Sequence, residues 1–140
     1  MYQANAHDSQ FQHQGLSAQQ QACIDRCEQC SRSCSFALEH SRKRGGALGT
    51  DGHLQMLQDC AQVCQVSADF LRRASPVLGQ TCETCAIVCE HCAHDCQRLI
   101  AAIGGDAVLE SCAEACRMCA ASCRAVFSSD SDGWAVAVNF

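Results

Sequence analysis

The cysteines of this chain recur at intervals of three and four residues, the spacing at which side chains return to one face of an α-helix. The chain has 140 residues and contains 15 cysteines. They fall into four groups: Cys23, Cys27, Cys30 and Cys34; Cys60 and Cys64; Cys82, Cys85, Cys89, Cys92 and Cys96; and Cys112, Cys116, Cys119 and Cys123. Each group predicts a helix whose buried face carries thiols in place of larger apolar side chains. The core of the protein is therefore its candidate functional site.

Helix start and stop signals surround each of these groups. Ser17 with Gln20 fits a capping box before the first group, and Gly45 follows its last periodic residue. Asp106 is placed to cap the fourth helix. Because the connections are short, successive helices should lie antiparallel, and the sequence predicts an all-α, antiparallel up-down-up-down four-helix bundle with a cysteine-lined core. The predicted helices cover residues 17–44, about 51–74, from between 75 and 80 to 103, and 107–127.

The length of the chain favours one domain. We expect a flexible N-terminal arm at residues 1–15, a metal-binding bundle at 16–127, and a linker with a C-terminal tail at 128–140. Within the last segment, Ser128–Gly133 reads as a linker. For the small apolar tail that follows it, docking on a neighbour and a frayed end both stay open.

Charge and composition exclude several classes of partner. The formal net charge is −5, from 10 lysines and arginines against 15 acidic residues, so no nucleic-acid surface is indicated. The N-terminal residues are polar, with no export signal, and no apolar run is long enough to cross a bilayer. The odd number of cysteines argues against a disulfide scaffold. We therefore expect a reduced, cytoplasmic protein with neither a nucleic-acid nor a membrane partner.

Thiols are much smaller than the leucine-sized side chains that usually fill a four-helix bundle. Four faces of thiols therefore predict a narrow lumen lined with sulfur. An empty lumen destabilises a protein, because each missing methylene group costs about 1 kcal/mol. We expect metal ions to fill it.

The kind of metal follows from the chemistry and spacing of the sulfurs. Thiolates are soft ligands that select Cu(I), zinc or iron–sulfur clusters. Zinc usually takes discrete sets of four ligands and iron–sulfur clusters usually take loop cysteines, whereas CxxC pairs such as Cys27 and Cys30 lie inside longer helices here. Cu(I) accepts two or three sulfurs, and bridging thiolates would give a capacity of roughly one ion per cysteine. Uptake should weaken in acid, because binding releases thiol protons.

The four cysteine groups resemble those of the copper storage proteins, a family of cysteine-lined four-helix bundles, over about residues 17 to 127. The resemblance implies a bundle that binds many Cu(I) ions along its interior. The chain is most similar to the cytosolic branch of the family, which implies a homotetramer, and a copper chaperone is a candidate donor. The second helix departs from the pattern, since Ser67 and Leu71 take the buried face after Cys64.

His40, His53 and Met56 should gather at one end of the bundle, where the first helix ends and the second begins. Imidazole and thioether are weaker Cu(I) ligands than thiolate, which suits a loading site, and the family resemblance supports this role. The alternative is that His40 and Met56 cover the surface and His53 is an exposed first-turn residue. Leu99, Ile103 and Leu109 are expected at the same end and are candidates to close it.

We interpret the chain as a non-enzymatic protein that stores or sequesters Cu(I), with all fifteen cysteines as ligands. Other classes of function stay open. One is a thiol redox protein that uses reversible disulfides, another is a zinc buffer, and a third is a structural protein held together by disulfides. A redox protein should expose a cysteine of low pKa.

Overall fold

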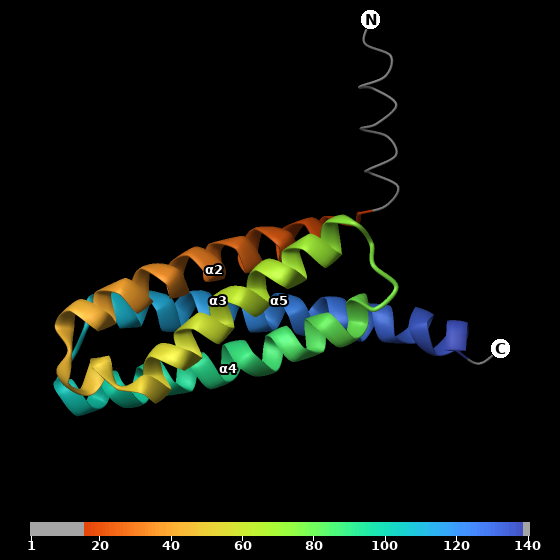
Figure 1. The fold of residues 1–140 in the computed structure, drawn as a ribbon. Helices are drawn as coiled ribbons and strands as arrows, with labels where there is room; N and C mark the ends of the chain where they lie inside the picture. The colour runs from red at the N-terminus through yellow and green to blue at the C-terminus, as the bar shows by residue number, and fades with distance from the viewer. Residues whose placement is uncertain (1–15, 139–140) are drawn as a thin grey trace, which may run out of the picture.

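Four long helices lie side by side in the computed structural model, which describes residues 16–138 and the side chains of residues 16–128 (Figure 1). They are α2 (Ala18–Arg44), α3 (Asp51–Arg72), α4 (Leu78–Ile103) and α5 (Ala107–Val138), with a short 3-10 helix, η1 (Gly46–Gly49), between α2 and α3. Successive helices run in opposite directions, so the predicted all-α, up-down-up-down four-helix bundle is confirmed. The predicted arm at residues 1–15 lies outside the described residues.

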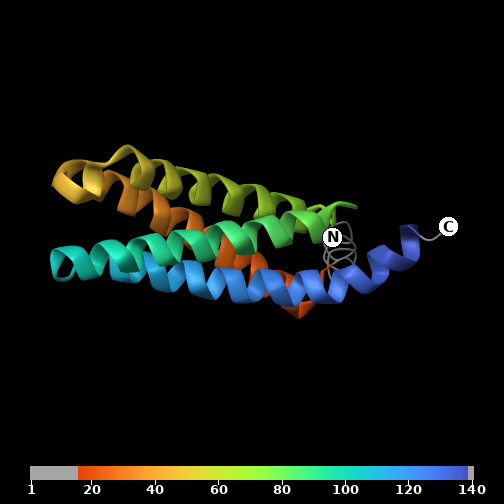
Figure 2. The same ribbon diagram turned by 90° about the horizontal axis from the view of Figure 1, so that it is seen from below.

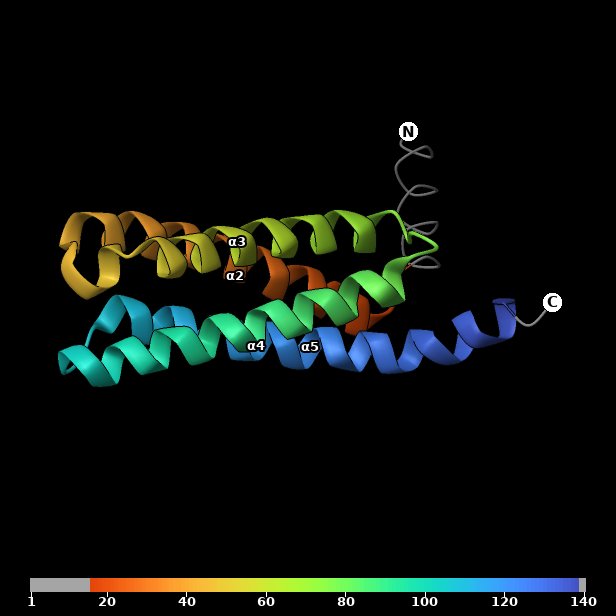
Figure 3. The same ribbon diagram turned by 60° about the horizontal axis from the view of Figure 1, so that its bottom comes forward.

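The helices form two layers, with α2 and α3 in one and α4 and α5 in the other (Figure 3). Each helix packs against two neighbours: α2 and α4 both contact α3 and α5. This square arrangement directs one face of every helix towards a common axis. The buried residues of each helix, including all its cysteines, lie on that face.

The first helix begins and ends where the sequence predicts. Ser17 Oγ accepts a hydrogen bond from the Gln20 amide at 3.0 Å, and Gln20 Oε1 accepts one from the Ser17 amide at 3.0 Å. This reciprocal capping box satisfies two backbone donors that have no partner inside the helix. At the other end, Gly45 takes a φ of 66°, which glycine adopts without steric cost, and its amide donates to Ser41 O.

The second helix ends earlier than predicted, at Arg72 instead of Ala74. Pro76 disfavours the helical conformation at the residue before it, so the chain must leave the helix ahead of this point. Ala74 makes the turn with a φ of 51°. The turn is closed by hydrogen bonds from Ser75 N to Phe70 O and from Ala74 N to Leu71 O. Helix α4 then begins at Leu78, inside the interval that the sequence left open.

The predicted linker at Ser128–Gly133 is wrong for the backbone, because α5 continues as a helix to Val138 and extends beyond the other helices (Figure 2). Serine and aspartate lower helix propensity only modestly, and one glycine costs about 1 kcal/mol. The single proline of the chain, Pro76, lies elsewhere. The change in composition at Ser128 therefore contains no strong stop signal.

Apolar side chains close both ends of the bundle around the cysteines. Burying a leucine-sized side chain stabilises a fold by about 1.5–3 kcal/mol, more than a thiol contributes. These apolar ends therefore supply hydrophobic stabilisation that the middle of the core lacks. Fully or almost fully buried residues are Ile24, Leu71, Leu78 and Val126 at the end where α2 begins, and Leu48, Leu57, Leu99 and Leu109 at the opposite end.

The start of α5 is tied to the end of α2 through Asp106. Its Oδ1 accepts a hydrogen bond from the Leu109 amide at 2.9 Å, and its Oδ2 lies 2.8 Å from both His40 Nε2 and Arg44 Nη1. Burial raises the pKa of Asp106, but the hydrogen bonds from His40 and the Leu109 amide outweigh it and hold that pKa below its usual value. The carboxylate both caps a helix and joins two helices.

Replacing Asp106 with alanine should destabilise the metal-free bundle. The lost helix cap alone costs about 1–2 kcal/mol, and the contacts with His40 and Arg44 are lost with it. Urea unfolding of the reduced, metal-free protein measures the change. The matched control is Gln58→Ala, an exposed position on α3. An Asp106→Ala protein as stable as this control would contradict the structural role of the carboxylate.

Candidate metal centre

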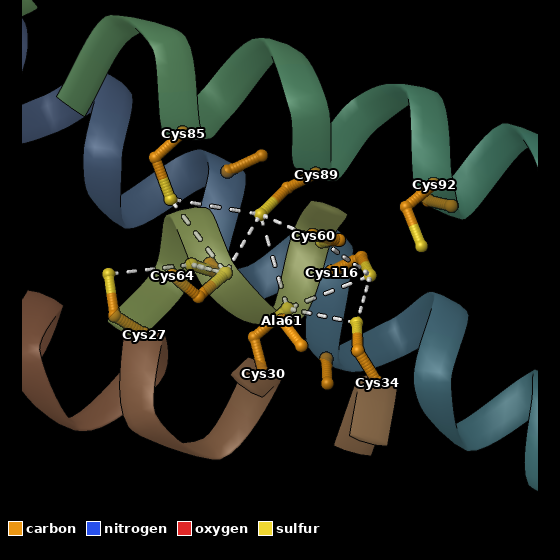
Figure 4. Close-up of a cluster of buried hydrophobic side chains, with 14 of the residues drawn as sticks. Cys27, Cys30, Cys34, Cys60, Ala61, Cys64, Cys85, Cys89, Cys92 and Cys116 are labelled. Carbon is orange, nitrogen blue, oxygen red and sulfur yellow. Dashed lines mark hydrogen bonds between the residues drawn. The ribbon is translucent and has the colours of Figure 1, made fainter. Parts of the chain in front are cut away.

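The cysteines of all four helices point towards one another around the bundle axis (Figure 4). The steps of three and four residues place successive thiols one turn apart on the inner face of each helix. All fifteen cysteines are buried, and all fifteen are free. The structure thus brings together every cysteine that the sequence predicted as a ligand. We call these fifteen side chains the sulfur core.

Neighbouring sulfur atoms in the sulfur core lie at distances that suit a shared metal ion. Cys64 and Cys89 are the closest pair, at 3.5 Å, and Cys30 and Cys34 on successive turns of α2 are 4.0 Å apart. A disulfide would require about 2.05 Å. An ion with four sulfur ligands at about 2.3 Å holds those sulfurs about 3.8 Å apart. The metal-free thiols are already close to the spacing of bound ligands.

Sulfur atoms also meet across the diagonals of the bundle. Cys30 on α2 lies 4.0 Å from Cys89 on α4, and Cys60 on α3 lies 3.9 Å from Cys116 on α5 (Figure 4). The predicted narrow lumen lined with sulfur is closed at these levels, because opposite thiols contact each other on the axis. Small neighbours such as Ala61 on the buried helix faces leave the helices room to approach.

The thiols form overlapping groups of four that could each hold a metal ion. Within each group the sulfur atoms all lie within 4.8 Å of one another. Most members belong to two groups, so neighbouring sites would share ligands. Five such groups are Cys27, Cys85, Cys119 and Cys123; Cys30, Cys60, Cys64 and Cys89; Cys30, Cys34, Cys60 and Cys116; Cys34, Cys92, Cys112 and Cys116; and Cys64, Cys85, Cys89 and Cys119.

Hydrogen bonds within the sulfur core lower the pKa of some thiols and raise the pKa of others. Hydrogen bonds from Cys116 and Cys34 lower the pKa of Cys112 to about 5, against the effect of burial. The partner Cys116 has a raised pKa, because its hydrogen bond to Cys112, together with others, stabilises its protonated form. Binding a soft cation to such a thiol displaces its proton.

The structure buries one of the two histidines predicted for the loading site. His53 is 2% exposed, so the alternative of an exposed first-turn residue is wrong. Its Nε2 lies 3.0 Å from Ser41 Oγ, and its Nδ1 lies 2.7 Å from Asp95 Oδ2. Burial raises the pKa of Asp95, but hydrogen bonds from His53 and Arg98 outweigh it and lower that pKa overall. Both ring nitrogens of His53 are thus engaged in the metal-free protein.

The other two candidates lie at the same end of the bundle and are only partly buried. His40 hydrogen-bonds to Asp106, and Met56 packs against the core one turn before Cys60. Leu99 and Leu109 are buried at this end and Ile103 is partly buried, and their role in closing it stays a prediction. We call the end defined by His40, His53 and Met56 the loading end; their contact with copper stays a prediction.

Sequence reasoning missed Ser41 and Asp95, which hold His53 in place. A signal for Ser41 was present, because the buried positions Cys30, Cys34, Ala37 and Ser41 continue the steps of four and three beyond the last cysteine of α2. Asp95 lies beside the buried face of α4, next to Cys96. Its position in the sequence does not indicate that it would contact His53.

Comparison with known proteins agrees with this geometry. A family model described as copper storage protein matches residues 9–128. The solved structure of the Nmul_A1745 protein from Nitrosospira multiformis is 34% identical with a TM-score of 0.70, covering 79% of this chain and 95% of that one. The Cu(I)-bound copper storage protein BsCsp3 is 25% identical with a TM-score of 0.69, covering 76% of this chain and 96% of that one.

A curated relative gives a shorter match. The cysteine-rich protein YhjQ of Bacillus subtilis (strain 168) is 26% identical over 76 residues, which is 54% of this chain and 70% of that protein.

Among the helices described, none is both long enough and apolar enough to span a bilayer.

The fifteen buried, free thiols predict a distinctive reactivity. Metal-free protein prepared under anaerobic conditions should react slowly with a thiol-specific chromogenic reagent while folded, because the thiols are shielded from solvent. After unfolding in guanidinium it should show all 15 thiols. The absorbance of the released chromophore measures both stages. A count well below this number after unfolding, recovered only by a reductant, would favour the disulfide alternatives.

Proposed function

Because the chain belongs to the copper storage protein family, we propose that it stores copper as Cu(I) on the thiolates of its sulfur core. The observation that carries this function is the set of overlapping groups of four buried thiols. Buried thiolates without a counter-charge are costly in an apolar interior, and a soft monovalent cation both neutralises and coordinates them. Copper is therefore the cargo of the protein and fills its core.

We assign all fifteen cysteines as copper ligands. The sharing of thiols between groups of four supports this assignment. Cys116, for example, belongs to two groups, one with Cys30 and one with Cys112. A thiolate that bridges two ions serves both sites, so the number of ions is not limited to one for every four cysteines. The capacity then approaches roughly one Cu(I) per cysteine, on the order of 15 ions.

A zinc buffer is the main alternative among metal-binding functions, and the same geometry limits its capacity. The groups of four include three that share no residue: Cys27, Cys85, Cys119 and Cys123; Cys30, Cys60, Cys64 and Cys89; and Cys34, Cys92, Cys112 and Cys116. Zinc in discrete tetrahedral sites would therefore saturate near three ions per chain. Zinc sites of this kind leave the remaining cysteines without a role.

The structure gives no support to a redox or hydrolytic function. Thiol exchange requires an accessible thiolate, whereas every cysteine is buried. The hydrogen-bonded chain of Ser41, His53 and Asp95 has the same arrangement as the nucleophile, base and orienting acid of a catalytic triad. Ser41 is 0% exposed, however, so no substrate reaches its hydroxyl. We assign Ser41 and Asp95 the role of holding His53 in place, in a protein that we propose is not an enzyme.

We propose that copper enters the sulfur core at the loading end. Met56 is partly exposed and lies one turn before Cys60, and His53 follows the same buried face outwards. Weak neutral ligands at this position could pass Cu(I) to thiolates, which bind it more tightly. The hydrogen bond between Ser41 and His53 would then have to open for Nε2 to contact the ion.

We further propose a cytoplasmic homotetramer that receives copper from a chaperone. Fifteen free thiols suit a reducing compartment. The apolar Phe36 side chain on α2 is 67% exposed and borders a surface groove shared with Val108 of α5. Exposed apolar surface of this kind is typical of contacts between protein subunits.

Anaerobic titration with Cu(I) tests the storage function. In the presence of a competing chromophoric chelator, each chain should take up far more than four ions, approaching roughly one per cysteine. Zinc titration provides the comparison and should saturate near three ions. Saturation with Cu(I) at four ions or fewer would contradict storage, and tight zinc with weak Cu(I) binding would favour the zinc buffer.

Replacing Met56 with leucine tests the loading end. The change keeps the volume but removes the thioether, so Cu(I) uptake should become several-fold slower while the final number of ions stays the same. Stopped-flow absorbance of copper–thiolate bands measures the rate. The control is Met118→Leu, the same chemical change at a methionine of α5 that contacts Arg26. Equal rates in both variants would remove Met56 from the loading pathway.

A further inference from the structure

Ser67 is a buried hydroxyl with no hydrogen-bond partner among the described residues. The side chain is 0% exposed and lies on the inner face of α3, where the buried positions run Cys60, Cys64, Ser67 and Leu71. Serine inside a helix often bonds the carbonyl one turn before it, but Ser67 does not. An unpaired buried hydroxyl destabilises a fold, so alanine would pack better in the metal-free protein.

The register of α3 against α4 places Ser67 along the sulfur core. Cys60 contacts Cys89 at 3.7 Å, and one turn further along α3 Cys64 contacts Cys85 at 3.8 Å. Because the two helices are antiparallel, the next step along α3 carries Ser67 past Cys64 towards the beginning of α4. The other three buried polar residues, Ser41, His53 and Asp106, lie at the loading end. Ser67 is thus separated from them by the cysteines of α3.

Near this part of α3 the other three helices contribute thiols. Cys27 of α2, Cys85 of α4, and Cys119 and Cys123 of α5 form a group of four with all sulfurs within 4.8 Å. Cys119 lies 3.6 Å from Cys27, and Cys27 lies 3.8 Å from Cys123. At the position of α3 where the spacing of Cys60 and Cys64 predicts a third cysteine, the chain has Ser67 and therefore a hydroxyl. Cys64 of α3 lies 3.8 Å from both Cys85 and Cys119 of this group, and Ser67 is the next buried polar side chain of α3 beyond Cys64.

We propose that the Ser67 hydroxyl donates a hydrogen bond to a copper-bound thiolate of this group, an inference that rests on the proposed storage function. Copper loading converts thiols to thiolates and releases their protons to solvent. A thiolate carries the negative charge that strengthens a hydrogen bond from a neutral donor, whereas a thiol is a weak acceptor. Rotation about one side-chain bond moves the hydroxyl between staggered positions without moving the backbone.

The hydroxyl acts as a donor and not as a ligand. Cu(I) is a soft ion that selects sulfur over neutral oxygen, so the cysteines hold the ion. A hydrogen bond to a ligating sulfur disperses the charge that remains when thiolates outnumber ions. Donors of this kind tune metal sites from outside the ligand set. Ser67 thereby stabilises the loaded state selectively, because only that state gives its hydroxyl a strong acceptor.

The variant Ser67→Ala should change the two states in opposite directions. Urea unfolding of the metal-free, reduced protein should show it to be as stable as the parent chain or more stable. Competition for Cu(I) against bathocuproine disulfonate should show a subset of ions bound about tenfold more weakly, the loss expected for a hydrogen bond to a charged acceptor. The remaining ions should bind with unchanged affinity.

The matched control is Ser31→Ala. Ser31 is partly buried, and its Oγ donates to Ala61 O at 2.8 Å in the metal-free structure. Its removal should lower the stability of the metal-free protein and leave copper affinity unchanged.

Two results would overturn the role of Ser67 while leaving storage intact. In the first, Ser67→Ala lowers the stability of the metal-free protein as Ser31→Ala does. In the second, Ser67→Ala binds every copper ion as tightly as the parent chain. A parent chain that saturates at four ions or fewer would instead overturn storage and this inference together.

Discussion

Close contact between buried thiols is the interaction on which the rest of this structure depends. Sulfur atoms from all four helices approach to between 3.5 and 4.0 Å, including pairs across the diagonals. Side chains of this size bury little apolar area, so the middle of the core contributes less hydrophobic stabilisation than a leucine core would. The apolar ends, with Leu71 on one side and Leu109 on the other, and the Asp106 contacts add stabilisation outside the sulfur core.

The same contacts explain why function and fold cannot be assigned to separate parts of the molecule. A typical metalloprotein places a few ligands on a scaffold that a separate core stabilises. Here the proposed ligand set is the core, and the groups of four share members such as Cys30 and Cys116. In our proposal the surface provides the entry of copper at the loading end and, through the exposed Phe36, a contact with a neighbouring subunit. The thiols proposed to bind copper extend along the axis of the bundle and do not form one local site.

The sequence predicted the cysteine faces and the bundle because both depend on local spacing. The capping box of Ser17 was equally local. Prediction failed where the outcome depends on stop signals or on distant partners. Helix α5 continues past Ser128 because no strong terminator lies there, and the hydrogen bond from His53 Nδ1 to Asp95, on a different helix, was not predicted. The spacing of residues within one helix carries no information about such a partner.

The diagonal contact between Cys30 and Cys89 has a mechanical consequence. An ion shared by these two sulfurs would join α2 to α4, helices that are not neighbours in the square of the bundle. Each such ion is a reversible cross-link between parts of the chain that are far apart in sequence, and a cross-link restricts the unfolded ensemble most when it closes a long loop. Bound copper ions would thereby cross-link the helices of a loaded bundle. The free energy of unfolding should then rise with the number of ions bound.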